Sequence, residues 1–232
     1  WRLWRGSEGR RRWLGPIALL MVIVQGVLGG LTVIFELVPS VSTAHLGLSL
    51  LFLGLVIYVW LRGERGARLV PVGGAAKRKQ LAWVMGALYL QILLGGLVRH
   101  TQAGMACGLD PILCLETLWP GTSLAQLHML HRIAAVLLGA AIAALAWGIG
   151  RAPDVEQTHR RLALGAVLLV LLQVGLGMLS VMSVLSPWTV TAHLAVAALL
   201  LGSLWALWLL MRAPFAEAFP ARDEAADALA PC

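Results

Sequence analysis

Long apolar stretches separated by short polar segments make up most of this chain. Each stretch holds about 20 residues or more, the length at which an α-helix crosses the hydrocarbon core of a bilayer. A spanning segment must satisfy its backbone hydrogen bonds internally, and the alternating pattern of a β-barrel strand is not found in this sequence. The sequence therefore predicts an all-α, polytopic bundle of six transmembrane helices, at 16–36, 42–61, 81–100, 124–149, 162–184 and 188–210.

Two helix pairs of this pattern are similar in sequence. Residues 25–62 align with residues 173–210 at an offset of 148 without a gap, and 16 of the 38 positions are identical. The identities include Gln25/Gln173, Gly29/Gly177, Pro39/Pro187, Thr43/Thr191, Ala44/Ala192, His45/His193, Gly54/Gly202 and Trp60/Trp208. A leucine-rich composition alone would not align Gln, Pro, His and Trp. Because both pairs run in the same direction across the membrane, the repeat is predicted to be parallel.

A third, partial copy lies in the third span. Q-I-L-L-G-G-L at 91–97 resembles Q-G-V-L-G-G-L at 25–31. Glycines on such helices allow close packing of neighbours or leave room for a flat ligand.

Composition and charge agree with a membrane protein. The 232 residues are 59% hydrophobic and 12% charged, whereas soluble domains carry about 25% charged residues. The formal net charge of +7 comes from Lys and Arg before the first span, in alternate loops and after the last span. The positive-inside rule makes these loops cytoplasmic and the cysteine loop external, as in a bacterial inner membrane. The basic balance therefore reflects topology and not a nucleic-acid partner.

The repeat also predicts the domain organisation. We expect a C-terminal four-helix half at 81–212, a cytoplasmic linker at 64–80 and a cytoplasmic tail at 213–232. Residues 1–63 would supply the last two helices of an N-terminal half. The chain opens with W-R-L-W-R-G-S-E-G-R-R-R, which is typical of the cytoplasmic exit of a helix, and without an initiator Met. We therefore expect two further helices to precede Trp1.

Two of the three cysteines, Cys107 and Cys114, lie in the longest external loop. The outside of such a membrane is oxidising, which favours a disulfide. Zinc is the alternative, but two thiols without a nearby loop histidine supply too few ligands. The disulfide would act as a loop staple or as a redox-responsive clasp over a site. Cys232 is terminal and is expected to be free.

Three histidines, His45, His131 and His193, occupy one layer of the predicted membrane region, and His45 and His193 lie within roughly 10 Å of its outer boundary. Ionisable side chains in a bilayer are costly and indicate function. Neutral imidazoles on facing helices of a bundle can ligate a heme axially. Interhelical hydrogen bonds and a proton relay are the alternatives, and for a relay only Glu36 offers a nearby carboxylate.

The segment H-M-L-H-R at 128–132 adds further candidates. His128 and His131 share a helix face, although one helix supplies one ligand to a heme face. Arg132 either pairs with a heme propionate or extends to the membrane surface. His100 is a candidate for the external mouth of the site, and His159 is expected to be a solvated residue of a cytoplasmic loop.

Taken in order, these motifs resemble the heme A synthase family over residues 15–211. The Q-x-x-L-G helices, the Pro–TAHL pairs, L-G-G-L-V-R at 94–99, the two-cysteine loop and the H-R helix carry the resemblance. The family is an eight-helix membrane protein made of two four-helix halves, with a disulfide that matches Cys107 and Cys114. The resemblance implies heme b between His131 and His193, and heme O as substrate at His45. The second substrate ligand and a family glutamate would precede Trp1. His100 has no family role.

The resemblance also implies an activity. The C8 methyl of heme O would be hydroxylated twice and lose water to give a formyl group, with water as the oxygen source and heme b as an electron relay. Heme O synthase and other oxidase assembly proteins are expected partners, and a homo-oligomer is an open alternative to a monomer. Two other functions are open. One is a non-catalytic bis-His b-type cytochrome subunit that uses the same two histidines. The other is a membrane assembly factor or transporter without heme.

Overall fold

The computed structural model describes residues 13–64, 74–110, 112–152, 155 and 157–211. These residues form α2 (Leu14–Ile34), α3 (Pro39–Glu64), α4 (Gly74–His100), η2 (Ala103–Met105), α5 (Ser123–Gly150), α6 (Gln157–Met182) and α7 (Pro187–Leu210). All six α-helices are long and apolar enough to cross a membrane. The predicted all-α, multi-pass membrane fold is therefore confirmed.

The helices differ from the predicted spans mainly at their ends. Helix α4 begins at Gly74 and not at residue 81, and α6 begins at Gln157 and not at residue 162. Hydropathy marks only the apolar part of a helix, whereas the helix itself continues through Lys and Arg residues whose long side chains reach the membrane surface. Helix α2 ends early because the residues after Phe35 turn out of the helix.

The connections after α2 and after α6 share one backbone conformation. Each contains two consecutive non-glycine residues with positive φ: Glu36 and Leu37 (52° and 65°), and Val184 and Leu185 (54° and 57°). The second residue of each pair donates its N–H over 2.8 Å, from Leu37 to the Thr32 carbonyl and from Leu185 to the Ser180 carbonyl. Left-handed residues cost about 1–2 kcal/mol each. The two similar sequences thus form the same strained turn, while the predicted domain boundaries stay a prediction.

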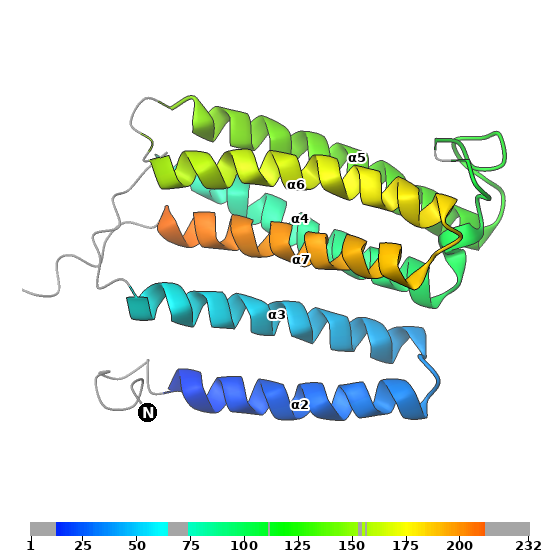
Figure 1. Ribbon diagram of the computed structural model, residues 1–232, viewed down its shortest axis with the longest axis horizontal. Coiled ribbons are helices and arrows are strands. Elements are labelled where there is room, and N and C mark those ends of the chain that lie inside the picture. The colour runs from blue at the N-terminus through cyan, green and yellow to red at the C-terminus, as the bar shows by residue number, and fades with distance from the viewer. Residues whose placement is uncertain (1–12, 65–73, 111, 153–154, 156, 212–232) are drawn as a thin grey trace, which may run out of the picture.

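The helices lie side by side, and their neighbours define where the site can form. Helices α4, α5, α6 and α7 pack as a closed group in which α4 contacts α5 and α7, and α6 contacts α5 and α7. Helix α3 packs on α4 and α7, and α2 packs mainly on α3 at the edge of the molecule (Figure 1). Among its described residues α2 has none that is buried. A hydrogen bond of 2.9 Å from Trp205 Nε1 to the Gly54 carbonyl joins α7 to α3.

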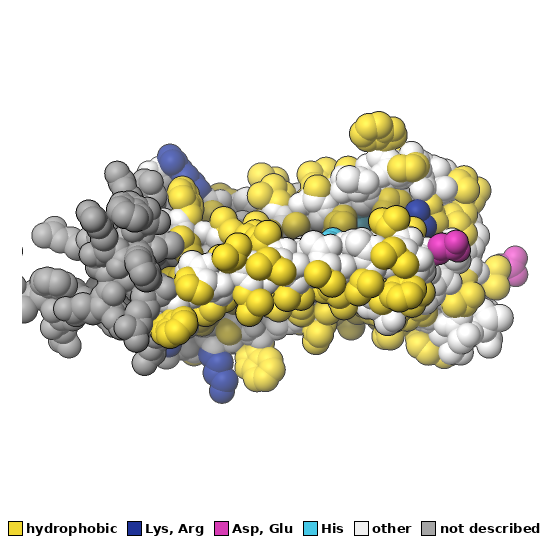
Figure 2. All heavy atoms as spheres, turned by 90° about the horizontal axis from the view of Figure 1, so that it is seen from below, with side chains coloured by type: hydrophobic (Ala, Val, Ile, Leu, Met, Phe, Trp, Pro, Cys, Tyr) yellow, Lys and Arg dark blue, Asp and Glu magenta, His cyan; other side chains and the backbone are white. Residues whose placement is uncertain are grey.

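The two ends of the bundle differ. We call the end with residues 35–38, 101–122 and 183–186 the disulfide end and the other end the basic end. The main apolar core lies toward the basic end, where Leu81, Ile142, Ile149, Ala163 and Leu207 are buried together. Figure 2 shows Lys and Arg side chains at the basic end, and acidic side chains together with a Lys or Arg side chain at the disulfide end. The same core cluster extends to Ile92 and Ala197, beside the residues of the histidine layer.

Candidate functional site

The three histidines of the predicted layer lie on α3, α5 and α7, and each ring packs against a glycine of the preceding helix. The pairs are Gly29 with His45, Gly95 with His131, and Gly177 with His193. A Cβ on these glycines would lie 3.2, 2.9 and 3.3 Å, in that order, from Cε1 of the facing ring. Carbon atoms normally approach to about 3.5–4.0 Å. Each imidazole therefore occupies space that only glycine leaves free.

A glutamine one helical turn before each glycine holds the same histidine through its backbone. Gln25, Gln91 and Gln173 donate an amide N–H to the carbonyl oxygens of His45, His131 and His193, over 2.9, 2.8 and 2.9 Å respectively. Residues four apart lie on one helix face, so each glutamine and glycine meet one histidine together. We call such a set of Gln, Gly and His a histidine cradle. The structure contains three histidine cradles in its described part.

The ring nitrogens of the cradle histidines are only partly engaged. The Gln91 amide nitrogen lies 2.9 Å from Nδ1 of His131. Nδ1 of His45 and of His193 is buried and has no hydrogen-bond partner among the described residues. None of the three rings has a hydrogen bond at Nε2 within the described residues. Each imidazole thus keeps Nε2 available for another ligand.

Two of the cradles belong to the closed four-helix group. His131 lies on α5 and His193 on α7, two helices that both pack on α4 and on α6. His45 lies apart, in the cradle formed by α2 and α3. A pair of imidazoles on opposite helices can bind a metal axially when a macrocycle supplies the other ligands. No group of three or more His, Cys, Asp or Glu in the described chain could hold a bare metal ion.

His128 is engaged differently from His131, although the two share a helix face. It is buried, and its Nε2 accepts a hydrogen bond of 3.2 Å from Nε of Arg132. Nη1 of Arg132 donates to the carbonyls of Asp110 and Leu113, at 2.8 and 3.3 Å. Nη2 of Arg132 is buried and without a partner among the described residues. Arg132 therefore reaches into the loop and not along the membrane surface, and one of its donors stays open.

That loop is closed by a disulfide between Cys107 and Cys114, with an S–S distance of 2.02 Å. The predicted disulfide is thus confirmed. Both sulfurs are buried and pack with Ala125 and Met129 of α5. The Met129 contact places the disulfide loop directly over the helix that carries His131.

The tip of the loop is ordered by Asp110. Its carboxylate accepts backbone N–H groups of Ile112 and Leu113, at 2.8 and 2.9 Å. These two hydrogen bonds hold the pKa of Asp110 below its usual range; desolvation opposes them in part, and the charge of Arg132 adds a smaller lowering. A charged Asp110 therefore stabilises the same loop that Arg132 binds.

The prediction for His159 was wrong. His159 lies in the first turn of α6 and is only 2% exposed. Its neighbours Ala163 and Ala166 are also buried, at the i+4 and i+7 positions of the same helix face. Because α6 starts at Gln157, this face enters the core at the basic end. His100, by contrast, ends α4 and belongs to none of the three cradles.

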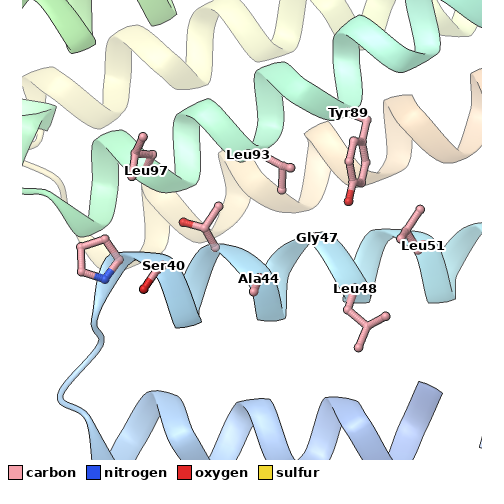
Figure 3. Close-up of a pocket in the computed structure, with 10 residues that line it drawn as sticks. Ser40, Ala44, Gly47, Leu48, Leu51, Tyr89, Leu93 and Leu97 are labelled. Carbon is pink, nitrogen blue, oxygen red and sulfur yellow. The ribbon is translucent and has the colours of Figure 1, made fainter. Parts of the chain in front are cut away.

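An open groove of about 480 Å³ lies on the α4 side of α3. Thr43, Gly47, Tyr89, Leu93 and Leu97 are among its lining residues, and the Tyr89 hydroxyl points toward α3 (Figure 3). His45 is not part of the lining, since its ring faces Gly29 of α2. The groove and the histidine layer are therefore separate features.

Sequence reasoning identified the three histidines but missed the glutamines as their contacts. Gln25, Gln91 and Gln173 were recognised only as markers of similarity between helices. The available signal was the spacing: each glutamine precedes a glycine by four residues, and the next helix carries the histidine.

The fold and the histidine layer define a polytopic helical membrane protein with imidazoles paired inside its bundle. Residues 1–205 match the family model COX15-CtaA, which is described as cytochrome oxidase assembly protein. The chain belongs to this family, and the resemblance to heme A synthases is confirmed.

Curated relatives named heme A synthase align with most of the chain. The protein from Geobacillus kaustophilus is 29% identical over 241 aligned positions, covering 97% of this chain and 74% of the relative. The one from Methylorubrum populi is 30% identical, covering 83% of this chain and 55% of the relative. The one from Symbiobacterium thermophilum is 31% identical, covering 82% and 64%. The chain thus spans between about half and three quarters of the length of these relatives.

Proposed function

We propose that this chain acts as a heme A synthase, an oxidoreductase that converts the C8 methyl of heme O to a formyl group with water as the oxygen source. The product would serve the assembly of cytochrome c oxidase. The observation that carries the proposal is the set of three histidine cradles at one depth of the bundle. The family match and the names of the relatives point to heme as the ligand of these imidazoles.

The chemistry of the four-helix group suits a resident heme b between His131 and His193. Heme supplies four of the six iron ligands itself, so two imidazoles with free Nε2 atoms complete the set. The glycines of both cradles make the space that the two imidazole rings occupy. When bound, heme b supplies one-electron transfer, because bis-His ligation leaves no open position on the iron.

Arg132 is the residue we assign to a heme propionate. Arg132 directly follows His131 in α5, and its Nη1 binds the disulfide loop. Its Nη2 is buried and has no hydrogen-bond partner among the described residues. Charge-assisted hydrogen bonds between Arg and carboxylates are short and strong. The same guanidinium holds Nε2 of His128, which leaves His131 as the histidine of α5 that is free to ligate.

His45 is the candidate axial ligand for the substrate heme O. It lies in its own cradle with Gln25 and Gly29, outside the closed four-helix group. This separation gives the substrate and the resident heme different histidines at the same depth. Helix α3 packs on α4 and α7 of that group, so the substrate site would lie beside the resident heme site.

We place the basic end in the cytoplasm and the disulfide end outside the cell inner membrane. Lys77, Arg151, Arg160 and Arg161 support this orientation through the positive-inside rule. Both heme sites would then lie near the outer face. Heme O synthase, which makes the substrate, is the partner that this activity requires.

The test is spectroscopy of the purified chain, with pigment analysis after co-expression with a heme O synthase. The wild-type chain should show a low-spin b-type spectrum and should form heme A. His131→Ala and His193→Ala should remove the b-type spectrum, whereas His45→Ala should keep it and lose heme A. His100→Ala, outside all cradles, is the control. A heme b spectrum without heme A would indicate an electron-transfer cytochrome, and a chain without any heme would overturn the proposal.

A further inference from the structure

We infer that Gln25 and Gln173 are positioning residues: each accepts the Nδ1–H of its cradle histidine, so that the lone pair of Nε2 faces the iron. The inference covers Gln173 at the resident heme and Gln25 at the substrate site. It rests on the proposed function, in which these histidines ligate heme iron.

The contact of Gln91 with His131 shows that the amide reaches the ring. The Gln91 side-chain nitrogen lies 2.8 Å from the His131 carbonyl and 2.9 Å from Nδ1 of the same residue. One amide group therefore lies between the backbone and the ring of one histidine. A contact of this kind fixes the rotation of the ring as well as the position of the helix.

The other two cradles contain unsatisfied partners for the same bond. Oε1 of Gln25 and Oε1 of Gln173 are buried without a hydrogen-bond partner among the described residues, and so is Nδ1 of His45 and of His193. In both cradles the amide nitrogen already binds the histidine carbonyl. Buried polar groups are rarely left unpaired, and each of these two cradles holds one free acceptor and one free ring nitrogen.

Iron ligation decides which ring nitrogen carries the proton. A neutral imidazole has one N–H, so a histidine that binds iron through Nε2 must carry its proton on Nδ1. The amide oxygens of Gln25 and Gln173 can accept that proton's hydrogen bond while their nitrogens keep the carbonyl contact. In the third cradle the Gln91 amide nitrogen faces both the carbonyl and Nδ1 of His131, so this glutamine lies outside the inference.

A hydrogen bond from Nδ1–H raises the donor strength of the ligand and orients the ring. A stronger donor stabilises ferric over ferrous iron. The inference therefore predicts a direction for the heme midpoint potential, whereas a glutamine that only ties two helices together predicts none.

The experiment compares Gln173→Met with Gln173→Glu in the full chain loaded with heme b. Met has a similar length but would not accept the Nδ1–H hydrogen bond, so the heme midpoint potential should rise. Each tenfold loss in the preference of the site for ferric over ferrous heme corresponds to a rise of about 59 mV. Glu offers a stronger acceptor, so the potential should fall below the wild-type value. Heme affinity should drop about 10–100-fold in Gln173→Met, as for other second-shell losses. The g values of the low-spin EPR signal should shift in opposite directions in the two variants, since they report the donor strength of the ligand.

Ser180→Ala is the matched control on the same helix. Its hydroxyl donates a hydrogen bond to the Leu176 carbonyl at 2.7 Å and not to a cradle residue, so potential and EPR signal should stay at the wild-type values. Both glutamine variants lose the wild-type amide donor. If the glutamine had a purely structural role, the midpoint potential would therefore shift in the same direction in both variants or in neither. Either of those results overturns the inference.

The outcomes separate this inference from the proposed function. A wild-type chain that binds no heme b refutes the function. A wild-type chain with heme b whose potential is insensitive to both substitutions refutes only the role of the glutamine. If Gln173→Met does not accumulate, Gln173→Glu decides alone: a potential at or above the wild-type value overturns the inference.

Discussion

Gly95→Ala should displace the ring of His131 and reduce heme b binding. The added methyl would lie 2.9 Å from Cε1, 3.5 Å from Nε2 and 3.6 Å from Nδ1 of the ring. Ordinary carbon contacts begin at about 3.5 Å, so the ring has to move by about 0.6 Å. Metal–ligand distances tolerate about 0.2 Å. The displacement is therefore larger than axial ligation accepts.

The three cradle glycines predict a graded series. The contact distances are 2.9 Å at Gly95, 3.2 Å at Gly29 and 3.3 Å at Gly177, so the required shift decreases in that order. Overpacking costs about 1–3 kcal/mol, against a gain of about 0.5–1 kcal/mol when Ala replaces a helical Gly. Gly95→Ala should lose the most heme b, and Gly177→Ala should lose less.

The same helices supply the controls. A Cβ at Gly86 of α4 or at Gly175 of α6 would meet nothing within 4 Å. Gly86→Ala and Gly175→Ala should therefore keep the heme content and raise the melting temperature slightly. The assay is the ratio of b-type absorbance to protein in purified samples, with a thermal melt of each variant. Equal heme content in Gly95→Ala and Gly86→Ala would refute the claim that the glycine makes room for the ring.

Three predictions concern the disulfide end. The Cys107–Cys114 disulfide closes a loop with a sequence separation of 7. Reducing it, or replacing Cys107 by Ser, should destabilise the protein by about 2–3 kcal/mol through loop-closure entropy. The melting temperature should fall, and an unchanged melting temperature with reductant would contradict this. Arg132→Gln should remove charge-assisted hydrogen bonds to the disulfide loop, worth about 1.5–3 kcal/mol each. The loop should then open more often, so its cysteines should be labelled faster after mild reduction than in wild type. Equal labelling rates would count against the contact of Arg132 with the loop. Because the folded-state pKa of Asp110 is lowered, its stabilisation is complete above the unfolded pKa of about 3.9 and is lost as the pH falls through the lower folded value. In Asp110→Asn, stability measured against falling pH should lack the loss that protonation of Asp110 causes in the wild type. The same pH dependence of stability in both proteins would refute this.

Much of the fold followed from hydropathy because the bilayer sets both the length and the composition of a spanning helix. The six helices were predicted at their centres, and α5 and α7 also at both ends to within one residue. The starts of α4 and α6 were missed, since a helix continues beyond its apolar segment. His159 illustrates the error: its basic sequence neighbours are typical of a solvated loop, yet the first turn of α6 packs it into the core. Burial at a helix end depends on the neighbouring helices, which hydropathy does not describe.

The candidate histidines were visible in the sequence because ionisable residues are rare in apolar spans and because His45 and His193 recur in one motif. Three further points depend on the tertiary structure. Arg132 binds His128 and leaves His131 free, three glycines make room for three rings, and three glutamines hold the same histidines. Sequence spacing places residues on a helix face, but the distance and angle between helices decide which side chains meet. The sequence alone therefore determined the membrane helices and the histidine layer, and helix packing decided which atoms of that layer can bind a ligand.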